Sequence, residues 1–443
     1  MLNQRPKLKD RKFVSDAVEK TIVKISQSIN NKRLASLFEN CFPNTLDTTV
    51  NFKNEEGKPD TFVITGDINA MWLRDSTAQV WPYVSLANED ENLKNMLKGV
   101  INRQAYSILI DPYANSFNPG PTGSEWEKDF TKMNPCLHER KWELDSLCYC
   151  IRLSYGFWKE TGDQSCFDLD WQKAMKAGLE TLLEQQRKDN RGSYTFGRVT
   201  SWSTDTVPGN GFGNPINPVG LIASIFRPSD DATIYPFLIP SNMFAVTSLK
   251  QLAEIYEKVI QDKDFSNRCL SLASEVEDAL MNYAVLSHLD FGKIYAYEAD
   301  GFGNYLFMDD ANIPSLLSLP YLGCCSSNDP VYQNTRRFVL SKKNPYFFEG
   351  KSARGIGSPH TLIDRIWPLS LIMQAMTSIE DEEILDCLKL LIATDAGTGF
   401  MHESFIKDDP NDFTRKWFAW ANSLFGELIV KLYNEKPYLL KTV

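Results

Sequence analysis

Apolar side chains recur every three or four residues along most of the chain, and this spacing places them on one face of an α-helix. We therefore predict about a dozen helices, with ends defined to within a few residues. They cover residues 14–29, 32–41, 76–88, 91–110, 141–161, 169–188, 249–259, 272–283, 312–319, 328–340, 363–378, 384–392 and 417–432. Strand-like stretches are short and lie near 61–65, 193–198 and 293–297. The pattern predicts an all-α fold.

Long polar loops rich in Gly, Pro and Asn separate the predicted helices, at 111–135, 200–236, 342–362 and 394–414. Loops of this length are uncommon in compact domains and are often functional. Successive helical hairpins with long loops on one side predict an (α/α)6 barrel, a toroid of six helix pairs with a pocket at one end. No low-complexity linker divides the chain. We expect one domain over residues 1–443, and two packed helical domains are the alternative.

Composition narrows the possible partners and the compartment. The net charge of −10 disfavours a nucleic-acid partner, and no apolar run is long enough to span a bilayer. Residues 1–11 are polar and basic and show no secretion signal. We expect a cytoplasmic protein, or an extracytoplasmic one if a signal has been removed. The nine cysteines lack metal-site spacing and are expected to be buried thiols, which favours a reducing compartment.

Aromatic residues make up 12% of the chain. Such an excess indicates a bulky core or a surface that stacks on flat ligands, of which sugars are the commonest. Four aromatic residues lie on predicted helical faces and are expected in the core: Trp158, Trp171, Phe244 and Phe425. Others lie in or beside polar motifs: Trp72, Tyr113, Trp126, Trp202, Trp367, Phe400 and Trp417.

The first motif is Trp72-Leu73-Arg74-Asp75, which precedes a predicted helix. Asp75 or Ser76 is able to cap that helix by accepting from its unpaired N–H groups. Capping does not explain an arginine, a carboxylate and a tryptophan side by side. A guanidinium and a carboxylate together bind adjacent sugar hydroxyls, and the indole offers a face to the ring. This motif is a candidate sugar-binding element.

The second motif runs from Trp202 to Tyr235 and contains Arg227 and the pair Asp230-Asp231. Two adjacent Asp in a polar loop fit a turn or a helix cap. They also fit a general acid, which needs a carboxyl group whose pKa is raised by burial or by a like charge. Asp231 is placed to supply that like charge.

The third motif, residues 397–405, presents His402 and Glu403 between glycines and aromatic residues. One interpretation is a surface turn with a solvated Glu. The other is that Glu403 is a general base that activates water, since paired carboxylates that flank the glycosidic bond perform sugar hydrolysis.

Two further motifs are candidate pocket walls. Residues 138–146 contain His138, Lys141 and Glu143, and are equally explained as an ion-paired helix start. Residues 352–367 contain Arg354 and His360 and are predicted to form a pocket loop that leads into a helix.

No cofactor or metal is expected. The histidines are far apart and form no HExxH motif. A phosphate-binding loop, a dinucleotide fingerprint and a G-x-S-x-G nucleophile elbow are also missing from the sequence.

At these motifs the chain resembles glycoside hydrolase family 125, the exo-α-1,6-mannosidases. The matching segments, in family order, are 42–49, 65–76, 111–115, 138–141, 227–232 and 401–404. The resemblance implies an (α/α)6 barrel and an inverting, metal-independent hydrolysis of terminal α-1,6-linked mannose, with Asp230 as acid and Glu403 as base. Arg74 and Asp75 then match residues that grip the terminal sugar and enforce exo action.

With the motifs, the resemblance predicts a substrate-binding set of Trp72, Arg74, Asp75, His138, Lys141, Glu143, Trp202, Arg227, Asp231, Arg354 and His402. The expected partner is a mannose-containing oligosaccharide, and we expect a monomer. The alternatives are a glucoamylase-like hydrolase of other specificity, a non-catalytic glycan-binding protein and a sugar epimerase. The scarcity of histidine disfavours the epimerase.

Overall fold

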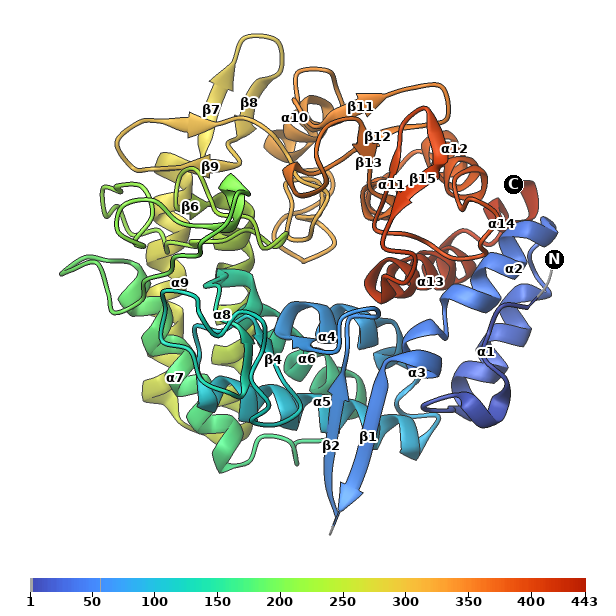
Figure 1. Cartoon of the computed structure of the whole chain (residues 1–443), viewed down its shortest axis with the longest axis horizontal. Helices are drawn as coiled ribbons and strands as arrows, with labels where there is room; N and C mark the ends of the chain where they lie inside the picture. The colour runs from blue at the N-terminus through green and yellow to red at the C-terminus, as the bar shows by residue number, and fades with distance from the viewer. Residues whose placement is uncertain (1–2, 56) are drawn as a thin grey trace.

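The computed structural model describes residues 3–55 and 57–443. The chain runs once around a ring, and its two ends lie side by side (Figure 1). The backbone N–H of Asn30 donates to the carbonyl of Leu440 at 3.3 Å, which joins the first and last segments. The helices are α1 (Asp16–Ser26), α2 (Lys32–Cys41), α3 (Asn44–Thr48), α4 (Leu73–Val80), α5 (Glu91–Ile110), α6 (Leu144–Thr161), α7 (Leu169–Gln185), α8 (Ile239–Ile255), α9 (Lys263–Tyr283), α10 (Pro330–Val339), α11 (Pro368–Met376), α12 (Asp381–Ala393), α13 (Ala419–Glu435) and α14 (Leu439–Thr442).

Helices dominate, as predicted, but the fold also contains small antiparallel sheets, so the all-α description needs correction. The strands are β1 (Val50–Glu55), β2 (Lys58–Val63), β3 (Met71–Trp72), β4 (Ser116–Phe117), β5 (Leu137–Glu139), β6 (Phe237–Leu238), β7 (Val285–His288), β8 (Gly292–Tyr295), β9 (Glu298–Ala299), β10 (Tyr305–Leu306), β11 (Phe347–Glu349), β12 (Arg354–Ile356), β13 (Arg365–Ile366), β14 (Ser404–Ile406) and β15 (Asp409–Thr414). Two of the three strand-like stretches correspond to β2 and β8, whereas 193–198 is irregular.

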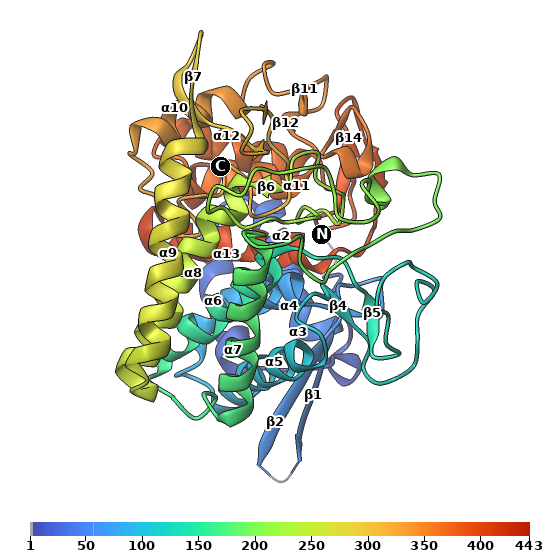
Figure 2. The same cartoon turned by 90° about the vertical axis from the view of Figure 1, so that its left-hand side faces the viewer.

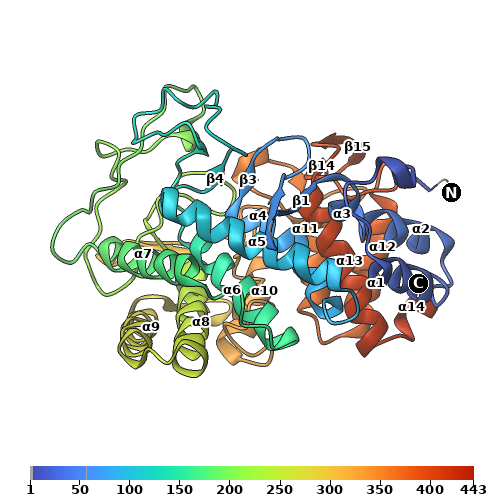
Figure 3. The same cartoon turned by 90° about the horizontal axis from the view of Figure 1, so that it is seen from below.

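Helix packing is sequential around the ring. Helix α4 packs on α6, α6 on α8, and α11 on α13, which in turn packs on α4. Helices α5, α9 and α12 cover these from outside, on α6, α8 and α11 respectively. All eight residues of α4 are buried, as expected for a helix covered on every face. Figures 2 and 3 show that the long loops after α5 and α7 project on the same side of the ring.

The segment 312–319 is not a helix, although its apolar spacing predicts one. Both carboxylate oxygens of Asp309 accept backbone N–H groups, from Leu316 at 2.8 Å and Leu317 at 3.0 Å. Pro314 and Pro320 have no N–H to donate to a helical ladder. The carboxylate accepts N–H groups that a helix would pair with its own carbonyls, and the prolines supply no N–H, so this buried segment forms turns.

Among the described residues, no helix has both the length and the apolar character needed to cross a bilayer.

Two helical glycines allow a matched test of how tightly the ring is packed. A Cβ at Gly426 in α13 would lie 2.6 Å from Phe42 Cδ2 and 2.8 Å from Phe42 Cα, whereas one at Gly178 in α7 would meet only Leu147 Cδ1 at 3.8 Å. We expect Gly426→Ala to lower the free energy of unfolding by about 1–3 kcal/mol. Gly178→Ala should raise it by about 0.5–1 kcal/mol. Urea denaturation measures both, and stabilisation by Gly426→Ala would contradict the packing.

Candidate active site

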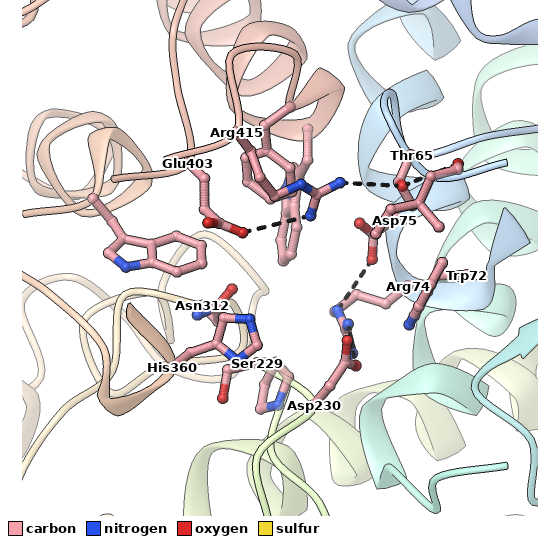
Figure 4. Close-up of a pocket in the computed structure, with 15 residues that line it drawn as sticks. Thr65, Trp72, Arg74, Asp75, Ser229, Asp230, Asn312, His360, Glu403 and Arg415 are labelled. Carbon is pink, nitrogen blue, oxygen red and sulfur yellow. Dashed lines mark hydrogen bonds and ion pairs between the residues drawn. The ribbon is translucent and has the colours of Figure 1, made fainter. Parts of the chain in front are cut away.

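A polar pocket of about 370 Å³, part of it open to solvent, lies where several loops and helix starts meet. Figure 4 shows side chains from separate parts of the ring converging on it. It is lined by Thr65, Ile68, Trp72, Arg74, Asp75, Pro228, Ser229, Asp230, Asn312, His360, Trp367, Glu403, Arg415, Phe418 and Trp420.

The start of α4 supplies one wall of the pocket. Strand β3 pairs with β4, and the N–H of Leu73 donates to the carbonyl of Asn115 at 3.0 Å. This pairing ends the strand at Trp72 and places Arg74 and Asp75 in the first helical turn. The side chain of Trp72 makes no cap, and Ser76 Oγ donates to the carbonyl of Leu73. The capping interpretation of this motif is therefore wrong.

Arg74 is the only cation in direct contact with four carboxyl groups in the described site, and its side chain is 3% exposed. The four contacts are Nε to Asp75 Oδ2 at 3.3 Å, Nη1 to Glu143 Oε2 at 2.6 Å, Nη1 to Asp145 Oδ2 at 3.5 Å and Nη2 to Asp230 Oδ1 at 3.1 Å. Burial disfavours the charged guanidinium, but the carboxyl groups together raise the pKa of Arg74 well above its ordinary value.

Asp230 occupies a left-handed backbone conformation, with φ of 66°. Its N–H donates to the carbonyl of Arg227, and the N–H of Arg227 donates to the carbonyl of Asp231, which closes a tight turn. Asp tolerates this conformation better than most residues, and such backbones cluster at functional sites. Burial raises the pKa of Asp230, but Arg74 chiefly outweighs it and holds the pKa below its usual range.

Asp231 does not line the pocket. Its Oδ1 accepts from Thr204 Oγ1 at 3.1 Å and lies 3.2 Å from His360 Nδ1. It was predicted to act as the like charge beside Asp230, but its carboxylate instead orients His360. The carboxyl group close to Asp230 is instead Glu143, at the start of α6. Burial, opposed by Arg74 and reinforced by the charge of Asp230, raises the pKa of Glu143 well above its ordinary value.

Glu403 faces Asp230 from the opposite side of the pocket (Figure 4). The N–H of Met401 donates to Asn422 Oδ1 at 3.0 Å, which ties this loop to α13 just before β14 begins. Glu403 Oε1 accepts from Arg415 Nη1 at 3.5 Å. Arg415 also pairs with Asp67, so a second cation supports this side of the pocket.

Three predicted substrate-binding residues lie next to the pocket without lining it. Glu143 is fully buried beneath Arg74. His138 packs against Trp72 with ring centroids 5.3 Å apart. Lys141 Nζ contacts Asp205 at 2.7 Å. These residues support the wall that contains the first motif.

Four other predicted substrate-binding residues lie outside the pocket. Arg227 is buried in an ion pair with Glu298 at 2.7 Å. His402 stacks on Phe413, at 3.7 Å between ring centroids. The remaining two are Trp202, which is 42% exposed on its loop, and Arg354, which is 58% exposed and faces Asp386 on α12. Their motifs reach the site, but these side chains point elsewhere.

Sequence reasoning missed Arg415, Asn312 and Trp420, and it named His360 in a pocket loop without including it in the substrate-binding set. Arg415 lies in a polar segment typical of a surface strand, and Asn312 lies in a predicted helix. Of the loop aromatics, Trp72 and Trp367 line the pocket, whereas Trp126 stacks on Arg198 at 3.6 Å.

Polar atoms of the lining are free to meet a ligand. Trp72 Nε1 and Ser229 Oγ are buried and have no hydrogen-bond partner among the described residues. Buried polar atoms of this kind require partners, and sugar hydroxyls both donate and accept. Across residues 3–55 and 57–443, no group of three or more His, Cys, Asp or Glu side chains is arranged to hold a metal ion.

Comparison with known proteins agrees with this geometry. The family model described as metal-independent α-mannosidase (GH125) matches residues 31–430. A solved Streptococcus pneumoniae metal-independent α-mannosidase, in a non-productive complex with α-1,6-mannobiose, is 42% identical with a TM-score of 0.92 and covers 96% of this chain and 100% of that one. The meiotically up-regulated gene 157 protein of Schizosaccharomyces pombe is 43% identical over 457 aligned residues, 99% of this chain and 90% of that protein.

A more distant likeness concerns the fold alone. The GH78 rhamnosidase of Bacillus sp. GL1 is 12% identical with a TM-score of 0.55, over 91% of this chain and 35% of that one. A helix-rich ring whose pocket holds facing carboxyl groups is an arrangement that glycoside hydrolases use, and the family match shows that class for this chain. The chain belongs to glycoside hydrolase family 125, the metal-independent α-mannosidases. The resemblance drawn from the motifs is thereby confirmed.

The contact of His360 with Asp231 has a measurable consequence. Burial lowers the pKa of His360, but Asp231 outweighs burial and raises it to about 9. We expect Asp231→Asn to lower this pKa by about 1–3 pH units, as followed by the imidazole C–H resonances in NMR. His402, whose pKa burial lowers to about 4, serves as the control and should not change. An unchanged titration of His360 in the variant would contradict the contact.

Proposed function

We propose that this protein is an inverting, exo-acting α-1,6-mannosidase that removes terminal α-1,6-linked mannose from mannosides or from N-glycan and mannan fragments. The observation that carries the proposal is the pair Asp230 and Glu403 on opposite sides of one polar pocket. The S. pneumoniae relative, solved with α-1,6-mannobiose, supports the linkage.

In the proposed mechanism, the terminal mannose enters the pocket with its non-reducing end inward. Asp230 protonates the leaving oxygen while Glu403 deprotonates a water on the opposite face of the ring. The transition state is oxocarbenium-like, and the product is β-mannose. Because a water must fit beside the base, the two carboxyl groups are expected to lie about 6.5–9.5 Å apart in the reacting complex.

Exo action is supported by the closed inner wall of the pocket. Arg74 and Asp75 are buried there, and the Trp420 ring lies 5.8 Å from the guanidinium carbon of Arg74. A charged pair backed by an aromatic ring binds the hydroxyls of one terminal sugar. We therefore expect this wall to stop a chain from continuing beyond that sugar.

We also propose that residues 1–443 form one (α/α)6 catalytic domain. The sequential packing of α4, α6, α8, α11 and α13 supports this count, with the buried segment 312–319 in the place of the sixth inner helix. We also propose that the protein acts as a monomer. The nine unpaired cysteines favour a reducing, cytoplasmic compartment.

The reaction itself is tested with α-1,6-mannobiose in the presence of a chelator, with the released anomer followed by NMR. We expect mannose to appear first as the β anomer, at a rate that the chelator does not change. Maltose serves as the control for a glucoamylase-like specificity and should not be cleaved. Release of α-mannose first would contradict inversion, and no release would contradict hydrolysis.

The two catalytic roles are tested by substitution. Asp230→Asn and Glu403→Gln should each lower kcat on α-1,6-mannobiose by about 10²–10⁴-fold or more, because each removes a proton-transfer group and leaves the binding contacts in place. Arg354→Ala, on β12 and outside the pocket, is the control and should leave kcat unchanged. If Asp231→Asn abolished turnover while Asp230→Asn stayed active, the acid would be assigned to the wrong residue.

A further inference from the structure

We propose that Glu143 is a positioning residue that stores, in the resting protein, the proton that Asp230 delivers to the leaving oxygen. The inference rests on the proposed function, in which Asp230 is the general acid. Glu143 does not line the pocket, so it acts through Asp230 and not on the sugar.

Glu143 and Asp230 are held by the same two side chains. Arg74 donates Nη1 to Glu143 at 2.6 Å and Nη2 to Asp230 at 3.1 Å. Asn115 Nδ2 lies 3.4 Å from Glu143 Oε1 and 3.3 Å from Asp230 Oδ1. Shared donors bring the oxygens of the two carboxyl groups together, where two full negative charges would repel. The pair is therefore expected to hold one proton between them.

The surrounding charges relieve this crowding only in part. Besides the pair, Arg74 contacts Asp75 and Asp145, so one guanidinium faces four carboxyl groups. Glu139 approaches from β5 through Asn115. The nearby cations already contact carboxylates of their own: Lys141 with Glu139 and Asp205, His360 with Asp231, and Arg415 with Asp67 and Glu403. We therefore expect at least one of the four carboxyl groups to be neutral.

Burial decides which member of the pair holds the proton. The side chain of Glu143 is 0% exposed, whereas that of Asp230 is 22% exposed and reaches the pocket. Burial, opposed by Arg74 and reinforced by Asp230, raises the pKa of Glu143 well above its ordinary value. Burial acts in the same direction on Asp230, but Arg74, Glu143 and Lys141 outweigh it and hold that pKa low. The resting proton therefore lies on Glu143.

The proton transfer balances in two steps. The O–H bond of Glu143 breaks and an O–H bond forms on Asp230; that bond then breaks as the leaving oxygen takes the proton. The Glu143 carboxylate that remains is stabilised by Arg74, Asn115 and Ser146 Oγ, which donates at 2.9 Å. Glu403 takes a proton from the attacking water. After product release Glu403 returns its proton to solvent, and solvent reloads the pair through Asp230.

The test compares two substrates in Glu143→Gln, which keeps the size of the side chain but holds no transferable proton. On α-1,6-mannobiose, kcat/KM at neutral pH should fall by about 10²-fold or more. On 2,4-dinitrophenyl α-mannoside, whose leaving group needs no proton, it should fall by less than about tenfold. The alkaline limb of the pH profile with mannobiose should move to lower pH, since Asp230 beside Arg74 then ionises alone.

Asp145→Asn is the matched control, because Asp145 is equally buried and contacts the same guanidinium but shares no second donor with Asp230. It should affect both substrates equally and move the alkaline limb to lower pH by less than Glu143→Gln does, because Asp145 adds only a like charge that raises the pKa of Glu143. Equal losses on the two substrates in Glu143→Gln, or an unmoved limb, would overturn the inference. Equal losses of kcat/KM on the two substrates in Asp230→Asn would instead show that Asp230 is not the acid. That result would contradict the proposed function.

Ser146→Ala keeps the inference testable if Glu143→Gln does not fold. Removing the hydroxyl donor makes the ionised form of Glu143 less stable and raises its pKa. The alkaline limb should then move to higher pH, and mannobiose turnover should fall a few-fold with no loss on the dinitrophenyl substrate. A limb that moves to lower pH in Ser146→Ala would contradict the inference.

Discussion

The contact of one buried guanidinium with four carboxyl groups is the constraint on which the site depends. Arg74 reaches Asp75 on its own helix, Glu143 and Asp145 at the start of α6, and Asp230 on a distant turn. A buried arginine without these partners would be strongly unfavourable, and so would the carboxylates without it. The charges therefore hold α4, α6 and the loop before α8 in one arrangement, and they divide protons unequally among the carboxyl groups.

The opposite side of the pocket is organised by a second cation. Arg415 contacts Glu403 at 3.5 Å and Asp67 more closely, so the carboxylate expected to accept a proton lies beside a positive charge. Asp230, the carboxyl group expected to donate a proton, instead shares its hydrogen-bond donors with a second carboxyl group, that of Glu143. The two carboxyl groups of the proposed mechanism therefore have different neighbours: Glu403 lies beside one cation, whereas Asp230 lies beside a cation and a second carboxyl group.

The turn that presents Asp230 depends on residues that never meet the ligand. Arg227 is fixed by Glu298, whose other oxygen accepts from the N–H groups of Ile234 and Tyr235. Asp231 holds His360. These contacts stabilise a left-handed backbone that costs about 1–3 kcal/mol when it is left unsupported. Several residues in the polar motifs are therefore supports of the turn, which explains why they are close to the active-site residues in sequence but absent from the pocket.

The sequence by itself determined most of the helices and the motifs that contain Arg74, Asp75, Asp230 and Glu403, because helical periodicity and clustered polar residues are local properties. Only the tertiary structure decided which segments meet. It brought Arg415 and Trp420 to the pocket, turned Arg354 and His402 away from it, and replaced a predicted helix at 312–319 with turns around Asp309. Spacing along a chain predicts which residues share a face, but the direction of a loop side chain depends on partners from other elements, such as Asp67 for Arg415, 348 residues away.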